Sequence, residues 1–303
     1  MREIARGLGF PEDPVAMEDG SVVLVEIERQ TLTRVRPNGA TEVIAHTGGG
    51  PNGAAIGPGG LFYLCNNGGF AWRLEAGMLR PVAQAASYSG GRIETVDPAT
   101  GTVQVLYDRC GEHLLRGPND IVFDRHGGFY FTDLGKSRAR DRDHGGLYYA
   151  TADGARITEI AYPILTPNGV GLSPDGATVY VAETETGRLW AFDLAAPGVA
   201  RKHGFPSPHG GRLIAGLPGY QRFDSLAVDA AGNICVATLI TGAITVIAPD
   251  GRVLRQVGTG DPMTTNICFG GKGRRTAFIT LSGRGALVAM DWPEAGLDLA
   301  YAG

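Results

Sequence analysis

The stretch Pro118-Asn119-Asp120-Ile-Val-Phe-Asp-Arg-His-Gly-Gly-Phe-Tyr-Phe-Thr-Asp133 decides how the rest of this sequence is interpreted. It combines an asparagine-bearing turn, a short apolar strand, a glycine turn and a second apolar strand. Segments of the same form recur along the chain, at residues 11–25, 51–64, 167–182, 223–237 and 265–280. Because a unit that recurs at a roughly fixed spacing indicates a repeat architecture, the fold is inferred from the repeat rather than from one motif.

Each repeat continues beyond these two strands. In the first repeat, strand-like segments at 15–17, 21–27, 32–35 and 41–44 are separated by the turn sequences Asp19-Gly20 and Asn38-Gly39. Six repeats in 303 residues leave about 50 residues each, enough for four short antiparallel strands and typical of propeller blades. We therefore predict an all-β fold, a six-bladed β-propeller with four-stranded antiparallel blades, as a single domain over residues 1–303.

The last repeat is one strand short. It begins near residue 262 and shows three strand-like segments, the last at 286–290, whereas residues 2–10 precede the first repeat with no partner of their own. A propeller protects its sheet edges by closing the ring. We therefore expect the N-terminal segment to supply the outer strand of the last blade.

Three segments interrupt the regular pattern. Residues 70–88 form an insertion in the second repeat that we predict to be a loop over one face. Residues 136–144 form the most charged segment, which is either a solvated loop or a lid that contacts an acidic or polyhydroxylated substrate. Residues 195–211, rich in proline and glycine, are predicted to connect the fourth blade to a fifth blade that begins near residue 212.

The composition narrows the classes of partner. The 47 glycines and the many short Val/Ile/Leu/Phe/Tyr runs favour a turn-rich β-structure. A net charge of -4 with mixed signs gives no basic stripe for nucleic acid and no polybasic segment for a membrane. No apolar run approaches the roughly 20 residues that a membrane span needs, and the first residues lack the apolar core of a secretory signal, so we expect a cytoplasmic protein. The four cysteines lack metal-ligand spacing and are interpreted as small buried hydrophobic residues.

Polar side chains precede the first strand of every repeat. Since the first strand of a propeller blade lines the central channel, we expect these side chains to converge on one mouth of it. Their oxygens suit a hard cation such as Ca²⁺, although Asn and Asp before a strand also form turns with their own backbone. Two carboxylates in a closed channel repel each other unless a cation or a proton compensates. The six residues are Glu12, Asn52, Asn119, Asn168, Asp224 and Asn266.

Several of these segments resemble one known family. Together they are similar to the gluconolactonase/regucalcin (senescence marker protein 30) family over nearly the whole chain. The segments are Phe10-Pro-Glu12-Asp-Pro14, Arg116-Gly-Pro-Asn119-Asp120, Pro167-Asn168-Gly169, Phe223-Asp224-Ser-Leu-Ala-Val-Asp229 and Thr265-Asn266-Ile-Cys-Phe-Gly-Gly271.

The resemblance implies a six-bladed propeller with one divalent metal ion, commonly Ca²⁺ and otherwise Zn²⁺, Mn²⁺ or Mg²⁺, and a lactone as the small-molecule substrate. It makes Glu12, Asn168 and Asp224 the core metal ligands and Asn119 a further ligand or substrate contact. It also gives Asp224 a second role as general base and places Arg116 near the family's substrate-contacting arginine, one residue further from Asn119 than the family spacing. Asn52 and Asn266 are second-tier channel residues.

This chain departs from the family pattern at two positions. Asp13 and Ser225 stand where the family usually has glycine after the ligand Glu and the ligand Asp. Both substitutions are expected to alter the pocket rather than abolish metal binding.

The expected activity is hydrolysis of a lactone or a related cyclic ester by a metal-dependent, gluconolactonase-like hydrolase. A bound Ca²⁺ would polarise the lactone carbonyl. The alternatives are a related hydrolysis of phosphotriesters, a strictosidine synthase-like enzyme, and a non-hydrolytic propeller that binds a small molecule or a protein around a structural metal. No Gly-x-Ser-x-Gly nucleophile motif occurs, and the six histidines fall in or near predicted turns and loops, with His144 and His209 expected to come nearest the channel mouth.

Overall fold

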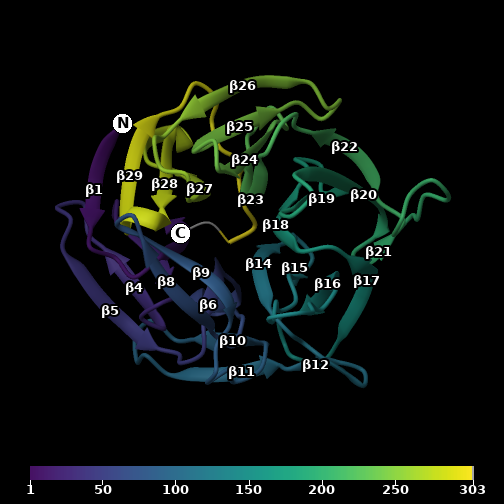
Figure 1. Ribbon diagram of the computed structural model, residues 1–303, viewed down its shortest axis with the longest axis horizontal. Helices are drawn as coiled ribbons and strands as arrows, with labels where there is room; N and C mark the ends of the chain where they lie inside the picture. The colour runs from purple at the N-terminus through teal and green to yellow at the C-terminus, as the bar shows by residue number, and fades with distance from the viewer. Residues whose placement is uncertain (302–303) are drawn as a thin grey trace.

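The computed structural model describes residues 1–301, in which strands β1–β29 account for nearly all regular structure. Six antiparallel sheets stand in a ring around a central channel (Figure 1). The innermost strand of each sheet contacts the innermost strand of the next, and the series closes on itself. The predicted six-bladed β-propeller is therefore confirmed.

Each blade is an antiparallel meander whose strands follow one another from the channel outward. Blades 1 to 3 consist of β2 (Pro11–Ala16), β3 (Val22–Glu26), β4 (Thr31–Val35) and β5 (Thr41–His46); β6 (Pro51–Ile56), β7 (Phe62–Asn66), β10 (Arg92–Val96) and β11 (Val103–Tyr107); and β14 (Pro118–Phe123), β15 (Gly128–Asp133), β16 (Gly145–Thr151) and β17 (Ile157–Ile164). Blades 4 to 6 consist of β18 (Pro167–Leu172), β19 (Thr178–Glu183), β20 (Arg188–Ala196) and β22 (Arg212–Gly216); β23 (Arg222–Val228), β24 (Ile234–Leu239), β25 (Ala243–Ile247) and β26 (Val253–Gly258); and β27 (Thr264–Gly270), β28 (Thr276–Leu281), β29 (Ala286–Asp291) and β1 (Arg2–Arg6).

Strand β1 closes the ring, as predicted from the incomplete last repeat. It pairs antiparallel with β29, and the two strands lie side by side at the upper left of Figure 1. The backbone N–H of Leu8 donates to the carbonyl of Gly285 at 2.9 Å, and the side chains of Ala5 and Leu8 are buried. The edge of blade 6 is thereby covered by a strand that comes from the other end of the chain.

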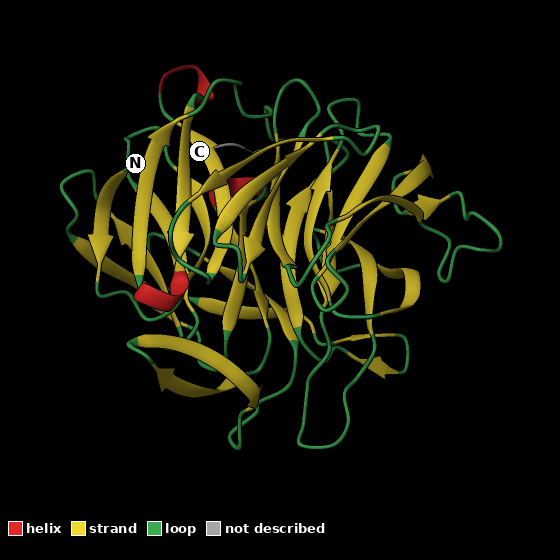
Figure 2. Ribbon diagram, turned by 45° about the horizontal axis from the view of Figure 1, so that its top comes forward, coloured by secondary structure: helices red, strands yellow, loops and turns green. Residues whose placement is uncertain are grey.

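Short helical turns and small hairpins complete the chain. The helical turns are η1 (Pro58–Gly60), η2 (Lys272–Arg274) and η3 (Ser282–Arg284), and they appear as small red segments in Figure 2. The additional strands are β8 (Phe70–Glu75), β9 (Met78–Gln84), β12 (Arg109–Cys110), β13 (His113–Leu114) and β21 (Val199–Ala200). None of the helical segments within residues 1–301 has the length and apolar character of a membrane span.

The structure corrects two details of the sequence prediction. The insertion at 70–88 is not an irregular loop, because β8 and β9 pair along their whole length as a hairpin. Residues 212–216 do not open the fifth blade but form β22, which pairs with β20 as the outer strand of blade 4. The excursion after β20 returns to the same blade, since the outer edge of β20 would otherwise lack a partner.

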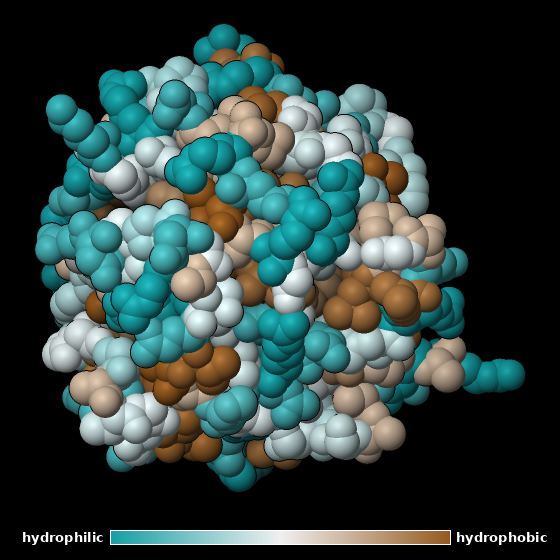
Figure 3. All heavy atoms as spheres, turned by 90° about the vertical axis from the view of Figure 1, so that its left-hand side faces the viewer, coloured by the Kyte–Doolittle hydropathy of each residue, from teal (hydrophilic) through white to brown (hydrophobic). Residues whose placement is uncertain are grey.

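The hydrophobic core lies between neighbouring blades. The middle strands are covered on both faces, so all five residues of β3 and all six of β15 are buried. This explains why the repeats show short continuous apolar runs rather than strict alternation. On the side of the molecule where β1 and β5 lie, hydrophilic side chains surround separate apolar patches (Figure 3). The cysteines are all free, with Cys65 and Cys235 buried and Cys110 and Cys268 partly buried.

Candidate active site at one mouth of the channel

A β-bulge interrupts the first strand of every blade close to the predicted site residues. The ladder shifts register between Pro118 and Ile121 in β14, and equivalent shifts occur in β2, β6, β18, β23 and β27. A bulge adds an unpaired residue and re-aims its side chain. The recurring polar residues thus lie within the innermost strands, not in a turn before them, and the bulges turn them toward the channel.

A glycine allows two of these strands to come close together. A Cβ atom on Gly169 would lie 2.7 Å from the backbone nitrogen of Leu226 and 2.8 Å from the backbone oxygen of Asp224. The Asn168-Gly169 pair in β18 therefore serves close backbone approach to β23 rather than a hairpin turn. This contact brings Asn168 beside Asp224.

Five of the six predicted channel residues line one cavity of about 570 Å³. Each of the five is between 4% and 8% exposed. They come from blades 1 to 5, so no two belong to the same sheet. They are Glu12, Asn52, Asn119, Asn168 and Asp224.

The sixth residue, Asn266, lies beside the cavity rather than in its wall. Its Nδ2 donates to Oε2 of Glu12 at 3.3 Å, and its Oδ1 accepts from the N–H of Ile267. The backbone N–H of Asp13 also donates to Oε2 of Glu12 at 3.1 Å. Asn266 therefore holds the Glu12 carboxylate in place.

Arg116 does not line this cavity. Its side chain is exposed, its backbone N–H donates to Asp133 at 2.6 Å, and its carbonyl accepts from the hydroxyl of Tyr88 at 2.7 Å. Neither His144 nor His209 lines the cavity, although both were expected near its mouth. His144 packs against Tyr162 and His209 packs against Trp190.

The two carboxylates of the cavity are strongly perturbed. Burial raises the pKa of Glu12 to about 8 and raises the pKa of Asp224 well above its ordinary range. The charge of Glu12 raises the pKa of Asp224 further, and a hydrogen bond from Asn168 opposes the shift. Two carboxylates that destabilise each other in a buried cavity are typical of a functional site.

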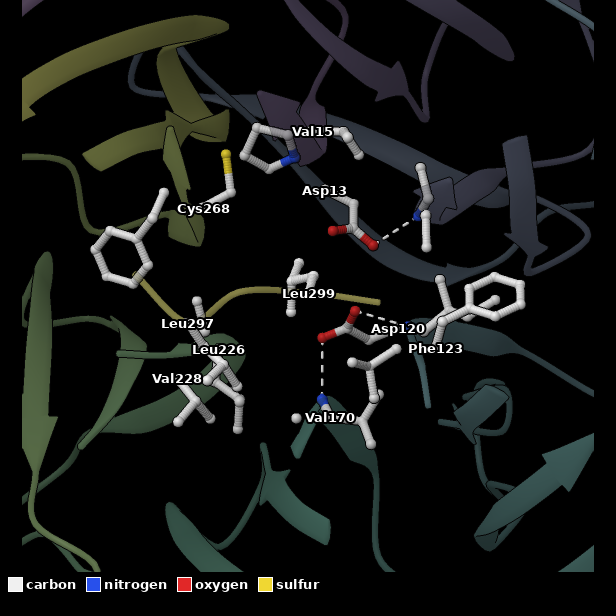
Figure 4. Close-up of a pocket in the computed structure, with 18 of the residues that line it drawn as sticks. Asp13, Val15, Asp120, Phe123, Val170, Leu226, Val228, Cys268, Leu297 and Leu299 are labelled. Atoms are coloured by element: carbon white, nitrogen blue, oxygen red, sulfur yellow. Dashed lines mark hydrogen bonds between the residues drawn. The ribbon is translucent and has the colours of Figure 1, made fainter. Parts of the chain in front are cut away.

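A second carboxyl pair, which sequence reasoning did not place in the site, lies deeper in the channel. Asp13 and Asp120 face each other at the centre of Figure 4, beneath the apolar residues of a second cavity. Oδ2 of Asp13 accepts from the N–H of Ala54 at 2.6 Å, and Oδ2 of Asp120 accepts from the N–H of Val170 at 3.0 Å. The signal was present in the sequence, because each aspartate directly follows a predicted site residue.

The second cavity lies at the other end of the channel. The C-terminal segment passes over it, and Leu297 and Leu299 cover it in Figure 4. Apart from Asp13 and Asp120, the cavity wall is largely apolar. The two ends of the channel therefore differ, and polar chemistry is concentrated at the mouth that contains Glu12 and Asp224.

The hairpin β8–β9 forms one wall of the polar cavity, and Lys136 holds it there. Nζ of Lys136 donates to Oδ1 of Asn67 at 2.9 Å and to the carbonyl of Gly69 at 3.0 Å, and it lies 3.8 Å from the ring centre of Phe70. Lys136 is 1% exposed, and burial lowers its pKa to about 7. The charged segment at 136–144 is thus anchored by a buried lysine, and Ser137 and Arg142 of this segment reach the cavity.

A scan against family models finds a match over most of the chain. The model described as SMP-30/Gluconolactonase/LRE-like region matches residues 10–283. Gluconolactonase from Zymomonas mobilis is 27% identical over 308 aligned positions, which cover 92% of this chain and 78% of that protein. Lactonase drp35 from Staphylococcus saprophyticus is 32% identical over 170 positions, which cover 56% of this chain and 49% of drp35. The alignment with drp35 thus spans about half of each protein.

Solved structures share the propeller along nearly the whole chain. A gluconolactonase from Xanthomonas campestris superposes with a TM-score of 0.74 at 22% identity, covering 96% of this chain and 89% of that one. Regucalcin from Agrobacterium tumefaciens, a calcium-binding protein, superposes with a TM-score of 0.75 at 18% identity, covering 98% and 94%. At these identities the superpositions establish the shared fold.

Proposed function

Because the chain belongs to the SMP-30/gluconolactonase/LRE-like family, we propose that it is a lactonase that hydrolyses a lactone or related cyclic ester with the help of a divalent metal ion, Ca²⁺ by preference. Its similarity to gluconolactonase from Zymomonas mobilis and to lactonase drp35 supports the reaction class. The observation that carries the proposal is the meeting of five buried oxygen-bearing side chains, each from a different blade, in one cavity.

The residues present fit a hard cation. Within residues 1–301, no group of three or more His, Cys, Asp or Glu side chains is arranged to hold a metal ion. The cavity instead combines two carboxylates with carboxamides, and carboxylate and amide oxygens are ligands that Ca²⁺ prefers. The mutual repulsion of Glu12 and Asp224 gives a reason for a cation, because a buried charge requires a partner.

Glu12, Asn168 and Asp224 would hold the ion, with Asn119 as a further ligand or substrate contact. A bound divalent cation would supply Lewis-acid polarisation of the lactone carbonyl. The carboxylate of Asp224, with its raised pKa, would accept a proton from the attacking water. The amide of Asn119, buried in the cavity wall, would donate to the oxygen on which negative charge develops.

Arg116 takes no part in this proposal, because its side chain is exposed and lies outside the cavity wall. The substrate is a small molecule that fits about 570 Å³. A cavity of this volume accommodates a single lactone ring with its substituents.

The proposal is tested with a panel of lactones and a pH-indicator assay, with and without a chelator. We expect at least one lactone to be hydrolysed, with activity lost on chelation and restored by Ca²⁺. Turnover that persists after the metal has been removed would contradict metal dependence. Purified protein that retains its metal but hydrolyses no lactone would instead favour a non-hydrolytic, small-molecule-binding propeller.

A further inference from the structure

Four arginines line the polar cavity, and they come from three segments around its mouth. Arg73 and Arg80 belong to the hairpin β8–β9, Arg142 belongs to the loop between β15 and β16, and Arg222 begins β23. Apart from Glu12 and Asp224, the residues that line the cavity include one acidic side chain, Glu185. Positive charge at the mouth therefore exceeds the negative charge that is present to balance it.

The two hairpin arginines occupy directly opposite positions on their strands. Arg73 pairs with Arg80 in the register of β8 and β9, and like charges in such positions destabilise a hairpin. The guanidinium of Arg80 pairs with Glu75 at 2.7 Å, whereas Arg73 has no ion-pair partner among residues 1–301. The hairpin thus presents an uncompensated guanidinium to the cavity.

The other two arginines share one carboxylate. Arg142 and Arg222 contact the two oxygens of Glu185 at 3.3 Å and 3.0 Å. The Nε of Arg222 is buried and has no hydrogen-bond partner within the described part of the chain. A buried donor without a partner requires an explanation, and a ligand that accepts this hydrogen bond supplies one.

We propose that the natural substrate is an acidic lactone, one whose ring carries an anionic substituent that Arg222 and Arg73 bind at the cavity mouth. This inference rests on the proposed function and names its substrate class. A divalent ion would neutralise Glu12 and Asp224, so the arginines would dominate the remaining field of the site. The planar guanidinium group matches a carboxylate or phosphate through paired N–H donors, and it keeps its charge at all physiological pH values.

The test compares two lactones that differ only in charge, 5-oxotetrahydrofuran-2-carboxylate and the corresponding carboxamide. We expect kcat/KM for the carboxylate to exceed that for the carboxamide by about tenfold or more at low salt, and the difference to shrink as salt is added. Arg222→Gln and Arg73→Gln should each reduce this preference about tenfold, mainly through KM. Arg252→Gln is the matched control, because Arg252 is an exposed arginine that pairs with Asp250 away from the cavity.

A binding measurement separates this inference from the proposed function. Tetrahydrofuran-2-carboxylate and its amide keep the ring and the charge difference but contain no lactone bond, and calorimetry reports their affinity for the metal-loaded protein. Tighter binding of the carboxylate, weakened in Arg222→Gln and Arg73→Gln, supports the anion site even if no lactone is hydrolysed. If both lactones are hydrolysed equally well and the arginine variants bind the carboxylate as the parent does, the anion site is wrong and the lactonase proposal stands.

Discussion

At the residue scale, Lys136 carries a large share of the local design around the site. It is the one lysine among residues 1–301 that is fully buried, and it ties the hairpin β8–β9 to the ring through Asn67 and Gly69. A buried ammonium group costs stability unless it is well paired. In this protein two oxygens and the face of Phe70 provide the pairing.

Replacing Lys136 by methionine removes these hydrogen bonds while keeping a similar shape. We expect a loss of about 1–3 kcal/mol in the free energy of unfolding at pH 9. The pKa of Lys136 is lowered to about 7 by burial, so between pH 7 and about 10 the unfolded chain binds more protons at this site than the native protein. The stability of the parent relative to Lys136→Met should therefore rise as the pH increases through this range.

Urea denaturation at pH 7, 8 and 9 measures this difference directly. Lys272→Met is the control for loss of a lysine, because Lys272 is exposed. Parallel stability curves for the parent and Lys136→Met over this pH range would show that burial of the lysine has no linked proton.

The sequence identified most of the site at this scale, and the reason is the repeat. Glu12, Asn168 and Asp224 occupy equivalent positions in different copies, so convergence on the channel followed from the fold. The displacement of Asn266 from the cavity wall and the burial of Lys136 could not be predicted in this way. Both depend on contacts with segments far away in sequence, such as Asn266 with Glu12.

At the scale of elements, the strand β1 joins the two ends of the chain. Its pairing with β29 is the link that turns a row of six sheets into a ring. Gly9, which follows it, donates its backbone N–H to Oε2 of Glu26 at 2.6 Å, so the segment is also fastened to blade 1.

Deleting residues 1–9 should open the ring between blades 6 and 1. We expect the melting temperature to fall by about 10 °C or more, because the deletion removes a strand pairing and two buried apolar side chains. Differential scanning calorimetry measures the change. Arg6→Gln serves as control, since it removes only an exposed ion pair with Glu3. An unchanged melting temperature in the deletion variant would refute the closure.

Elements that follow the repeat were predictable, and elements that interrupt it were not. The N-terminal closure followed from counting strands in the last repeat. The assignment of 212–216 to blade 4 did not, because a long excursion separates β22 from β20 and pairing depends on which edge is free. The bulges were also missed, since a register shift exists only relative to the neighbouring strand.

At the scale of the whole molecule, the ring creates one site from separate repeats. No single blade contains enough ligands for a metal ion, and blades 1 to 5 each contribute one of the predicted side chains to the polar mouth. The bulges aim these side chains inward, and the opposite end of the channel is covered by the C-terminal segment. Specificity is added by the segments around the mouth that carry the arginines.

The central claim is that Glu12, Asn168 and Asp224 hold a divalent ion on which lactone hydrolysis depends. The most direct measurement titrates Ca²⁺ into metal-free protein and follows bound metal by calorimetry and lactone hydrolysis in the same samples, for the parent and for Asp224→Asn. We predict that activity in the parent rises in proportion to one bound ion per chain, and that Asp224→Asn loses about 100-fold or more in both metal affinity and hydrolysis. An Asp224→Asn protein that binds Ca²⁺ and hydrolyses the lactone as the parent does would contradict the claim.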